Sequence, residues 1–188
     1  MTPRTALSIA GSDPSGGAGI QADLKTFAAL GVHGMAALAG LTVQNTQGVR
    51  AASPIDPGFV VAQVEAVLDD IEVHATKLGM LTNAGIAGAV ADLITARRAD
   101  FGFLVLDPVM VATSGDRLLA DEAVEVVRTR LLPLADLITP NVPETAVLAG
   151  ASRAGDVSGL QAQAEGLASS RRAPVRSWQR AVTWPARS

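Results

Sequence analysis

Short apolar runs alternate with longer segments of helical periodicity along this chain, and that alternation limits the folds open to it. Between the runs, apolar side chains recur every three or four residues, as they do on one face of a helix. Strands and helices that alternate through short links predict a layered α/β domain with a mostly parallel sheet. The five predicted strands are residues 5–11, 35–43, 75–81, 103–107 and 135–140.

Local signals predict where the helices begin and end. A helix over residues 20–30 ends at Gly31, and Asp56 followed by proline indicates the start of a second helix. Asn83 can cap a third helix, which would run through residue 99, and Pro133 closes a fourth.

The composition supports a buried sheet and excludes several kinds of protein. Aliphatic residues dominate the 48% hydrophobic fraction, as in parallel strands buried on both faces. A net charge of −3 argues against a general nucleic-acid or membrane-surface binder. The absence of cysteine excludes disulfides, thiolate metal sites and a catalytic thiol in this chain. No signal peptide or membrane-spanning run is visible, since Asp107 interrupts the longest apolar candidate, so we expect a cytoplasmic protein.

Polar and glycine-rich segments follow the predicted strands. Ligands bind outside the carboxyl ends of the strands in such sheets. The topology should therefore bring five segments together, namely 11–19, 42–48, 79–83, 107–115 and 139–144.

The first of these segments contains Gly11, Gly16, Gly17 and Gly19. Leading into a helix, such a loop can present backbone N–H groups to an anion or a polar group. It lacks the lysine of a P-loop and the spacing of a dinucleotide fingerprint. A flexible turn without a ligand explains the glycines equally well. Asp23 borders the apolar stripe of the following helix, either as a ligand contact or as a solvated acid favoured by the helix dipole.

Three further positions and one loop segment each have both a chemical and an ordinary explanation. Gln44 follows a strand, and its primary amide suits the edge of an aminopyrimidine, although a polar turn would also use it. Asp107 ends a strand and could hold Mg²⁺ near phosphates, or simply form an Asp-Pro turn. Glu144 could join it, or serve as an ordinary first-turn helix acid. Thr113–Gly115 could cradle phosphate or form a loop.

Five motifs in order resemble the hydroxymethylpyrimidine/phosphomethylpyrimidine kinase family of thiamine biosynthesis: "AGSDPSGGAGIQADLKTF", "LTVQNTQGV", "KLGMLTN", "LDPVMVATSGDRLL" and "LITPNVPE". The resemblance covers about residues 5 to 165. It implies a three-layer α/β/α ribokinase-like fold. It also implies transfer of the ATP γ-phosphoryl group, with Mg²⁺, to 4-amino-5-hydroxymethyl-2-methylpyrimidine and then to its monophosphate.

The resemblance also assigns roles to residues of this chain. It implies that Gln44 binds the pyrimidine ring, that Asp23 binds the hydroxymethyl end, and that Gly11, Met80 and Val109 form the pocket wall. It implies that Asp107, Asn141 and Glu144 organise ATP phosphates, with Asp107 and Glu144 as metal ligands.

The chain departs from the family pattern near its end. A Lys-Gly-Gly-like turn and a Gly-Thr-Gly-Cys-like helix start, which supply the anion hole and the catalytic group, are both absent, so no catalytic residue is assigned. We expect an incomplete kinase domain over 1–168 and a divergent arginine-rich tail over 169–188, produced by a reading-frame change, with weak or no activity. A natural basic tail is the alternative explanation of that segment. The alternative functions are a non-catalytic pyrimidine-binding remnant and a pyridoxal kinase-like enzyme; a homodimer remains open.

Overall fold

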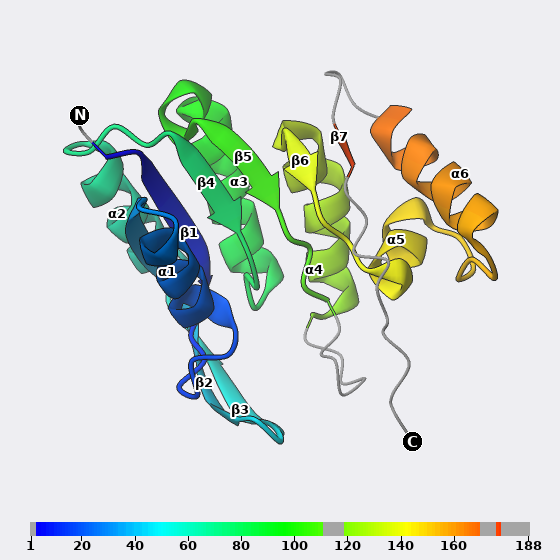
Figure 1. Cartoon of the computed structure of the whole chain (residues 1–188), viewed down its shortest axis with the longest axis horizontal. Coiled ribbons are helices and arrows are strands. Elements are labelled where there is room, and N and C mark those ends of the chain that lie inside the picture. The colour runs from blue at the N-terminus through cyan, green and yellow to red at the C-terminus, as the bar shows by residue number, and fades with distance from the viewer. Residues whose placement is uncertain (1–2, 111–118, 170–175, 178–188) are drawn as a thin grey trace.

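The computed structural model describes residues 3–110, 119–169 and 176–177, and these form one sheet flanked by helices (Figure 1). The described strands lie in the order β3-β2-β1-β4-β5-β6-β7. Their bounds are Thr5–Gly11 (β1), His33–Asn45 (β2), Gly48–Pro54 (β3), Ala75–Leu78 (β4), Phe103–Leu106 (β5), Leu137–Ile138 (β6) and Arg176–Ser177 (β7). Every neighbouring pair is parallel except β2 and β3, which are antiparallel. The predicted α/β class with a mostly parallel sheet is confirmed.

Helices cover the sheet on both faces. The α-helices of the described residues are α1 (Gly19–Ala29), α2 (Pro57–Leu68), α3 (Ala84–Ala96), α4 (Asp121–Val126), α5 (Val142–Ala149) and α6 (Val157–Ser169). α1 packs on β1 and β2 at the front in Figure 1, whereas α3 and α4 lie behind the sheet. None of the described helices is long and apolar enough to cross a membrane.

The centre of the sheet is its best buried part. All residues of β1 are buried, and Leu7, Ile9, Leu78 and Leu104 are each 0% exposed. Parallel strands need such apolar residues because helices cover both of their faces. Burying each large aliphatic side chain contributes about 1.5–3 kcal/mol. β1, β4 and β5 therefore form a rigid base for the loops at their carboxyl ends.

The predicted helix starts at Asp56 and Asn83 are confirmed. The Asp56 carboxylate accepts a hydrogen bond from the Phe59 N–H at 3.0 Å, and the Asn83 side chain accepts one from the Ile86 N–H at 2.9 Å. α3 ends at Ala96, slightly earlier than predicted. The helix predicted to end at Pro133 is α4, which continues through a π-helical turn and then a short 3₁₀ turn that contains this proline.

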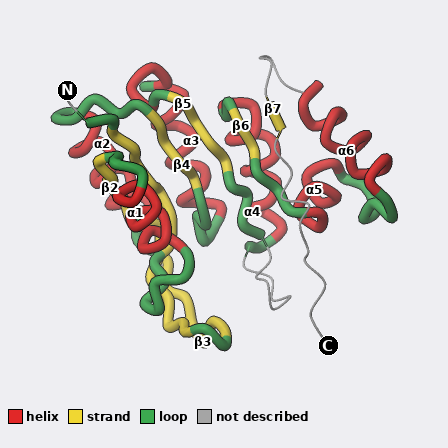
Figure 2. The backbone as a smooth tube through the Cα atoms, viewed as in Figure 1, coloured by secondary structure: helices red, strands yellow, loops and turns green. Residues whose placement is uncertain are grey.

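The β2–β3 hairpin differs from the sequence prediction. β2 extends to Asn45, and after a short turn the chain returns as β3, which projects with the end of β2 beyond the rest of the sheet (Figure 2). β3 reads "GVRAASP" and none of its residues is buried, so it has no apolar alternation to reveal a strand. The strands predicted at 75–81 and 135–140 are shorter than expected, because the chain leaves the sheet at Leu78 and Ile138.

Candidate active site

A cavity of about 880 Å³ opens at the carboxyl ends of the central strands. Its walls come from the ends of β1, β2, β4, β5 and β6, from β3, and from the starts of α1 and α5. The structure thus brings together residues that lie far apart in the sequence. Every site residue predicted from the sequence lines this one cavity: Gly11, Asp23, Gln44, Met80, Asp107, Val109, Asn141 and Glu144. The phosphate-loop candidates Thr113–Gly115 lie outside the described residues.

Asp13 organises the glycine loop from within. The residue is 2% exposed, and one carboxylate oxygen accepts hydrogen bonds from the Ser15 N–H and hydroxyl at 2.9 and 2.7 Å. The other accepts from the backbone N–H groups of Gly17 and Ala18 at 3.0 and 2.9 Å. The amides of Gly17 and Ala18 are therefore bonded within the loop itself, which explains these two positions without a ligand.

These hydrogen bonds also set the charge state of Asp13. Burial alone would raise the pKa of its carboxyl, but the bonds from the Ser15 hydroxyl and from the Ser15, Ala18 and Gly17 amides outweigh burial and lower that pKa below its ordinary value of 3.8. A carboxyl with a lowered folded-state pKa stabilises the fold above its unfolded-state pKa. That stabilisation is lost as the pH falls through the lower, folded-state pKa.

Asp13→Asn is expected to destabilise the protein by about 1.5–3 kcal/mol near neutral pH, because an amide NH₂ would face backbone donors. The difference from the wild type should shrink as the pH falls through 3.8 and below, where the wild-type carboxyl takes up a proton. Urea unfolding at several pH values measures both effects. Asp56→Asn is the matched control, since asparagine caps a helix as well as aspartate does. An equal loss in both variants would contradict the role given to Asp13.

A charged cluster joins α1 to the ends of β4 and β5. The Ser8 hydroxyl donates to Asp23 Oδ2 at 2.7 Å, and Lys77 Nζ donates to Asp23 Oδ1 at 2.7 Å. Lys77 Nζ also lies 3.6 Å from Asp107 Oδ2. The side chains of Lys77, Asp23 and Asp107 are only 26%, 13% and 17% exposed. Asp23 is therefore a paired, largely buried acid rather than a solvated one.

Sequence reasoning missed Lys77. The available signal was a lysine inside the apolar strand "ATKLGML", where a charge is costly unless it is paired. Its partner Asp23 lies 54 positions away in the sequence, so no local pattern connects the two.

Gln44 reaches the cavity from the end of β2, and Thr42 holds its side chain. Thr42 Oγ1 lies 2.8 Å from the Ser12 carbonyl oxygen and 3.2 Å from Gln44 Oε1. A hydroxyl has one proton to donate, so the shorter contact favours Ser12, and the Gln44 amide then turns its NH₂ toward the threonine oxygen. In either orientation Thr42 contacts one end of the amide, and no described residue bonds the other end.

Gly11 and Met80 form one wall. A Cβ atom added to Gly11 would lie 2.5 Å from Met80 Cε, so the methionine packs directly against bare backbone. An alanine here would displace the thioether into the cavity. Val109 lines the same cavity just after Asp107, so Gly11 contributes bare backbone and Met80 and Val109 contribute apolar side chains to the wall.

Asn141 and Glu144 cap α5 reciprocally. The Asn141 side chain accepts from the Glu144 N–H at 2.9 Å, and Glu144 Oε2 accepts from the Asn141 N–H at 2.8 Å. Glu144 Oε1 also accepts from the Met110 N–H at 3.3 Å, and the residue is 4% exposed. Glu144 therefore ties α5 to the segment after β5.

The acids of the cavity offer a partial fit for Mg²⁺. Among the described residues, no three His, Cys, Asp or Glu side chains are grouped as metal ligands. Mg²⁺ commonly binds one or two carboxylates and otherwise water and substrate phosphates. Asp107, which is partly exposed to the cavity, fits that pattern, whereas both Glu144 oxygens already accept backbone hydrogen bonds.

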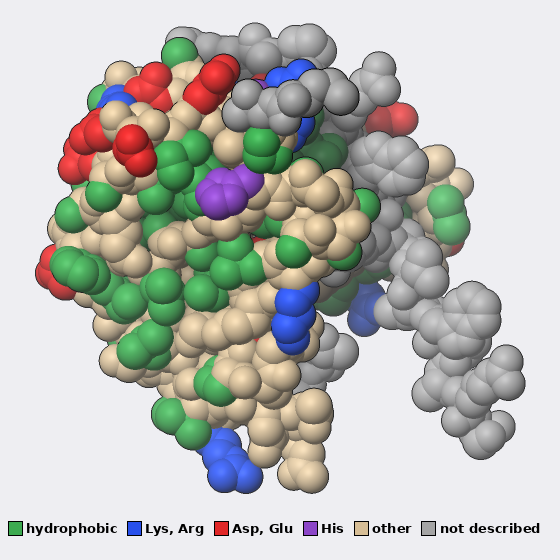
Figure 3. Space-filling view, turned by 60° about the vertical axis from the view of Figure 1, so that its left-hand side comes forward, with side chains coloured by type: hydrophobic (Ala, Val, Ile, Leu, Met, Phe, Trp, Pro, Cys, Tyr) green, Lys and Arg blue, Asp and Glu red, His purple; other side chains and the backbone are tan. Residues whose placement is uncertain are grey.

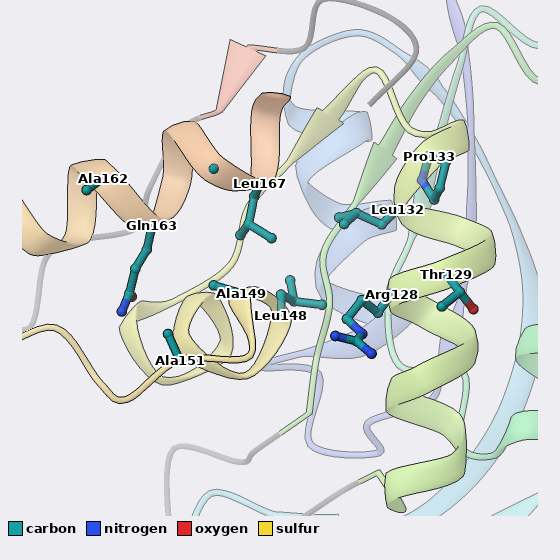
Figure 4. A pocket seen from close by; sticks show the side chains of 11 residues that line it. Arg128, Thr129, Leu132, Pro133, Leu148, Ala149, Ala151, Ala162, Gln163 and Leu167 are labelled. Carbon is teal, nitrogen blue, oxygen red and sulfur yellow. The ribbon is translucent and has the colours of Figure 1, made fainter. Parts of the chain in front are cut away.

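A second cavity, of about 760 Å³, lies between α5, α6 and the turn that follows α4 (Figure 4). Its lining is mainly apolar and includes Leu132, Leu148 and Leu167. It contains none of the residues predicted for the site, so we assign the chemistry to the first cavity.

Comparisons with known proteins identify the family of the chain. A family model described as phosphomethylpyrimidine kinase matches residues 13–175. The hydroxymethylpyrimidine/phosphomethylpyrimidine kinase of Salmonella typhimurium is 49% identical over 162 residues, which are 86% of this chain and 60% of that protein. The Escherichia coli protein of the same name is 52% identical over 149 residues, 79% of this chain and 55% of that protein. The chain thus spans little more than half the length of these curated relatives.

Solved structures show the same fold. A phosphomethylpyrimidine kinase from Clostridium difficile superposes with a TM-score of 0.88 at 37% identity, covering 98% of this chain and 78% of that one. A Bacillus subtilis pyridoxal kinase gives a TM-score of 0.78 at 37% identity, covering 88% of this chain and 61% of that one. The fold is therefore ribokinase-like, and the chain belongs to the phosphomethylpyrimidine kinase family.

Proposed function

We propose that the protein transfers the γ-phosphoryl group of ATP to 4-amino-5-hydroxymethyl-2-methylpyrimidine and to its monophosphate, in thiamine biosynthesis. The observation that carries this proposal is the meeting of Gln44, Asp23 and Asp107, from three separate segments, in one cavity. The names of the relatives support it.

The cavity offers each part of the acceptor a suitable group. The Gln44 amide would pair with the ring edge, where an aminopyrimidine presents a donor beside an acceptor: its oxygen would accept from the amino group, and the N–H that does not face Thr42 would donate to the ring nitrogen. Gly11, Met80 and Val109 would contact the ring faces. Asp23 would accept a hydrogen bond from the hydroxymethyl group.

The opposite side of the cavity would hold the nucleotide. Two solved structures of the pyridoxal kinase from Staphylococcus aureus contain nucleotides. One is a complex with ADP, and the other is a complex with AMP-PCP and pyridoxal. Asp107, Asn141 and Glu144 would organise the ATP phosphates here. Asp107 is the carboxylate proposed to lie nearest to Mg²⁺, and Glu144, whose two oxygens already accept backbone hydrogen bonds, would hold the start of α5 beside it. That ion, when bound, would neutralise phosphate charge, while the protein positions the acceptor oxygen toward the γ-phosphorus. A cytoplasmic location belongs to the same proposal.

Transfer of labelled phosphate from ATP to the hydroxymethylpyrimidine tests the proposal. Two proteins should be compared: this chain, and a chimera of residues 1–168 with the C-terminal part of the Salmonella typhimurium relative. We expect transfer by the chimera and weak or no transfer by this chain. A chimera that folds but transfers nothing would contradict the proposed function. The boundary of the kinase domain at residue 168 is still a prediction. β7 lies beyond this boundary and pairs with β6.

Two alternatives make different predictions in the same assays. A pyridoxal kinase, suggested by the solved neighbours, would prefer pyridoxal over the hydroxymethylpyrimidine in direct competition. A non-catalytic remnant would bind the pyrimidine in a calorimeter without turnover in either protein.

We also propose a homodimer formed through the outer face of the β2–β3 hairpin. Leu41 and Val43 are 51% and 57% exposed there. The face of the molecule drawn in Figure 3 shows several hydrophobic groups among polar ones. Sedimentation equilibrium should give a dimer for the wild type and a monomer for Leu41→Lys combined with Val43→Lys. Leu30→Lys, at an exposed position on α1's C-terminal end, is the control. A wild-type monomer would contradict the proposal.

A further inference from the structure

Lys77 occupies an unusual position for a cation. It points from β4, the strand beside β1 in the middle of the sheet, into the cavity, and its side chain is only 26% exposed. Its ammonium group has three N–H donors. Among the described residues it makes one hydrogen bond, to Asp23, because Asp107 at 3.6 Å is an ion pair beyond hydrogen-bond length. Two N–H groups therefore remain for a ligand.

The charges around Lys77 are unfavourable for an anion. Asp23 and Asp107 flank the ammonium, so the three groups carry one net negative charge. Asp13 and Glu144 also line the cavity, although backbone N–H groups satisfy both. Among the described residues, Arg153 is the other cation on the lining, and it is exposed at the α5–α6 connection. Of these two cations, Lys77 is thus the partly buried one, and it lies beside Asp23.

The two proposed acceptors place different demands on this cluster. The hydroxymethyl group is neutral and needs only a hydrogen-bond acceptor such as Asp23. The monophosphate carries a charge of about −1.5 to −2 on the same substituent, which brings it next to two carboxylates. A cation at that point offsets the repulsion, and its two remaining donors match phosphate oxygens.

We infer that Lys77 binds the phosphate of the monophosphorylated acceptor and so determines whether the cavity accepts a phosphomonoester as well as an alcohol. This inference rests on the proposed function. It makes Lys77 a specificity-determining residue for the second phosphorylation. In that step an oxygen of the bound phosphate attacks the γ-phosphorus of ATP, the bond between the γ-phosphorus and the bridging oxygen breaks, and ADP leaves.

Calorimetric titration of the full chain with each pyrimidine, without nucleotide, tests the inference. Lys77→Met should weaken binding of the monophosphate by about 10- to 100-fold. It should change binding of the alcohol by less than about threefold, because no charged contact to the alcohol is lost. Lys77→Arg, which keeps the charge, should restore part of the monophosphate affinity. Lys25→Met is the matched control, because Lys25 lies on α1, bonds the Gly16 carbonyl and does not line the cavity.

Salt dependence provides a test that needs no variant. In the wild type, affinity for the monophosphate should fall more steeply with sodium chloride than affinity for the alcohol. Equal salt dependence, or equal weakening of both ligands by Lys77→Met, would overturn the inference and leave Lys77 as a partner that only positions Asp23. A wild-type chain that binds neither pyrimidine would instead defeat the proposed function.

Discussion

Gly19→Ala is expected to destabilise the protein by about 3 kcal/mol, since it combines backbone strain with an atomic overlap. Gly19 begins α1 with a φ of +55°, a left-handed conformation that costs alanine about 1–2 kcal/mol. A Cβ atom there would also lie 2.3 Å from the Gly11 carbonyl oxygen, which is backbone and cannot turn away. The end of β1 and the start of α1 would have to separate, and the cavity between them would lose its shape.

Two other glycines separate these contributions. Gly31 has a φ of +69° with no atom within 4 Å of an added Cβ, so Gly31→Ala should show the strain alone. In the same loop as Gly19, an added Cβ at Gly17 would meet Asp13 at 3.6 Å, an ordinary contact, so Gly17→Ala should cost least. Urea unfolding of the three variants gives the order. A Gly19→Ala variant as stable as Gly31→Ala would contradict the close approach of β1 and α1.

Gln44→Ala is expected to weaken binding of the hydroxymethylpyrimidine by about 100-fold. The amide is the group proposed to pair with the ring edge, and its loss would leave ring donors and acceptors without their protein partner. Titration calorimetry should therefore register little or no heat. The fold should be unaffected, because the side chain bonds only Thr42 among the described residues.

Gln47→Ala is the matched control for this prediction. Gln47 lies in the turn of the same hairpin, is exposed and does not line the cavity, so the same truncation should leave pyrimidine binding unchanged. If Gln44→Ala binds the pyrimidine as tightly as Gln47→Ala does, the ring is not held by the amide at position 44.

The central strands could be predicted from the sequence because apolar runs and the glycines beside them are local features of the chain. β1 is buried throughout and bounded by glycine, and the capping side chains of Asp56 and Asn83 bond amides only three residues away. The convergence of Gln44, Asp23 and Asp107 followed from topology, since parallel strands present their carboxyl ends on one edge.

Other features depend on contacts that a local pattern cannot contain. The Lys77–Asp23 pair joins β4 to α1, and its two residues lie 54 positions apart in the sequence. In the sequence Asp13 is one of several polar residues in a glycine loop, whereas in the structure its carboxylate accepts hydrogen bonds from the amides of that loop. β3 is exposed and carries no apolar pattern, so its antiparallel pairing with β2 is what defines it as a strand.

A crystal structure of the chain with bound 4-amino-5-hydroxymethyl-2-methylpyrimidine tests the account most directly. We predict the ring against Gly11 and Met80, with the Gln44 amide at about 2.9 Å from the ring nitrogen and the amino group. The hydroxymethyl group should lie beside Asp23 and Lys77. A ring bound outside this cavity, or a Gln44 side chain directed into solvent while the ring is bound, would contradict it.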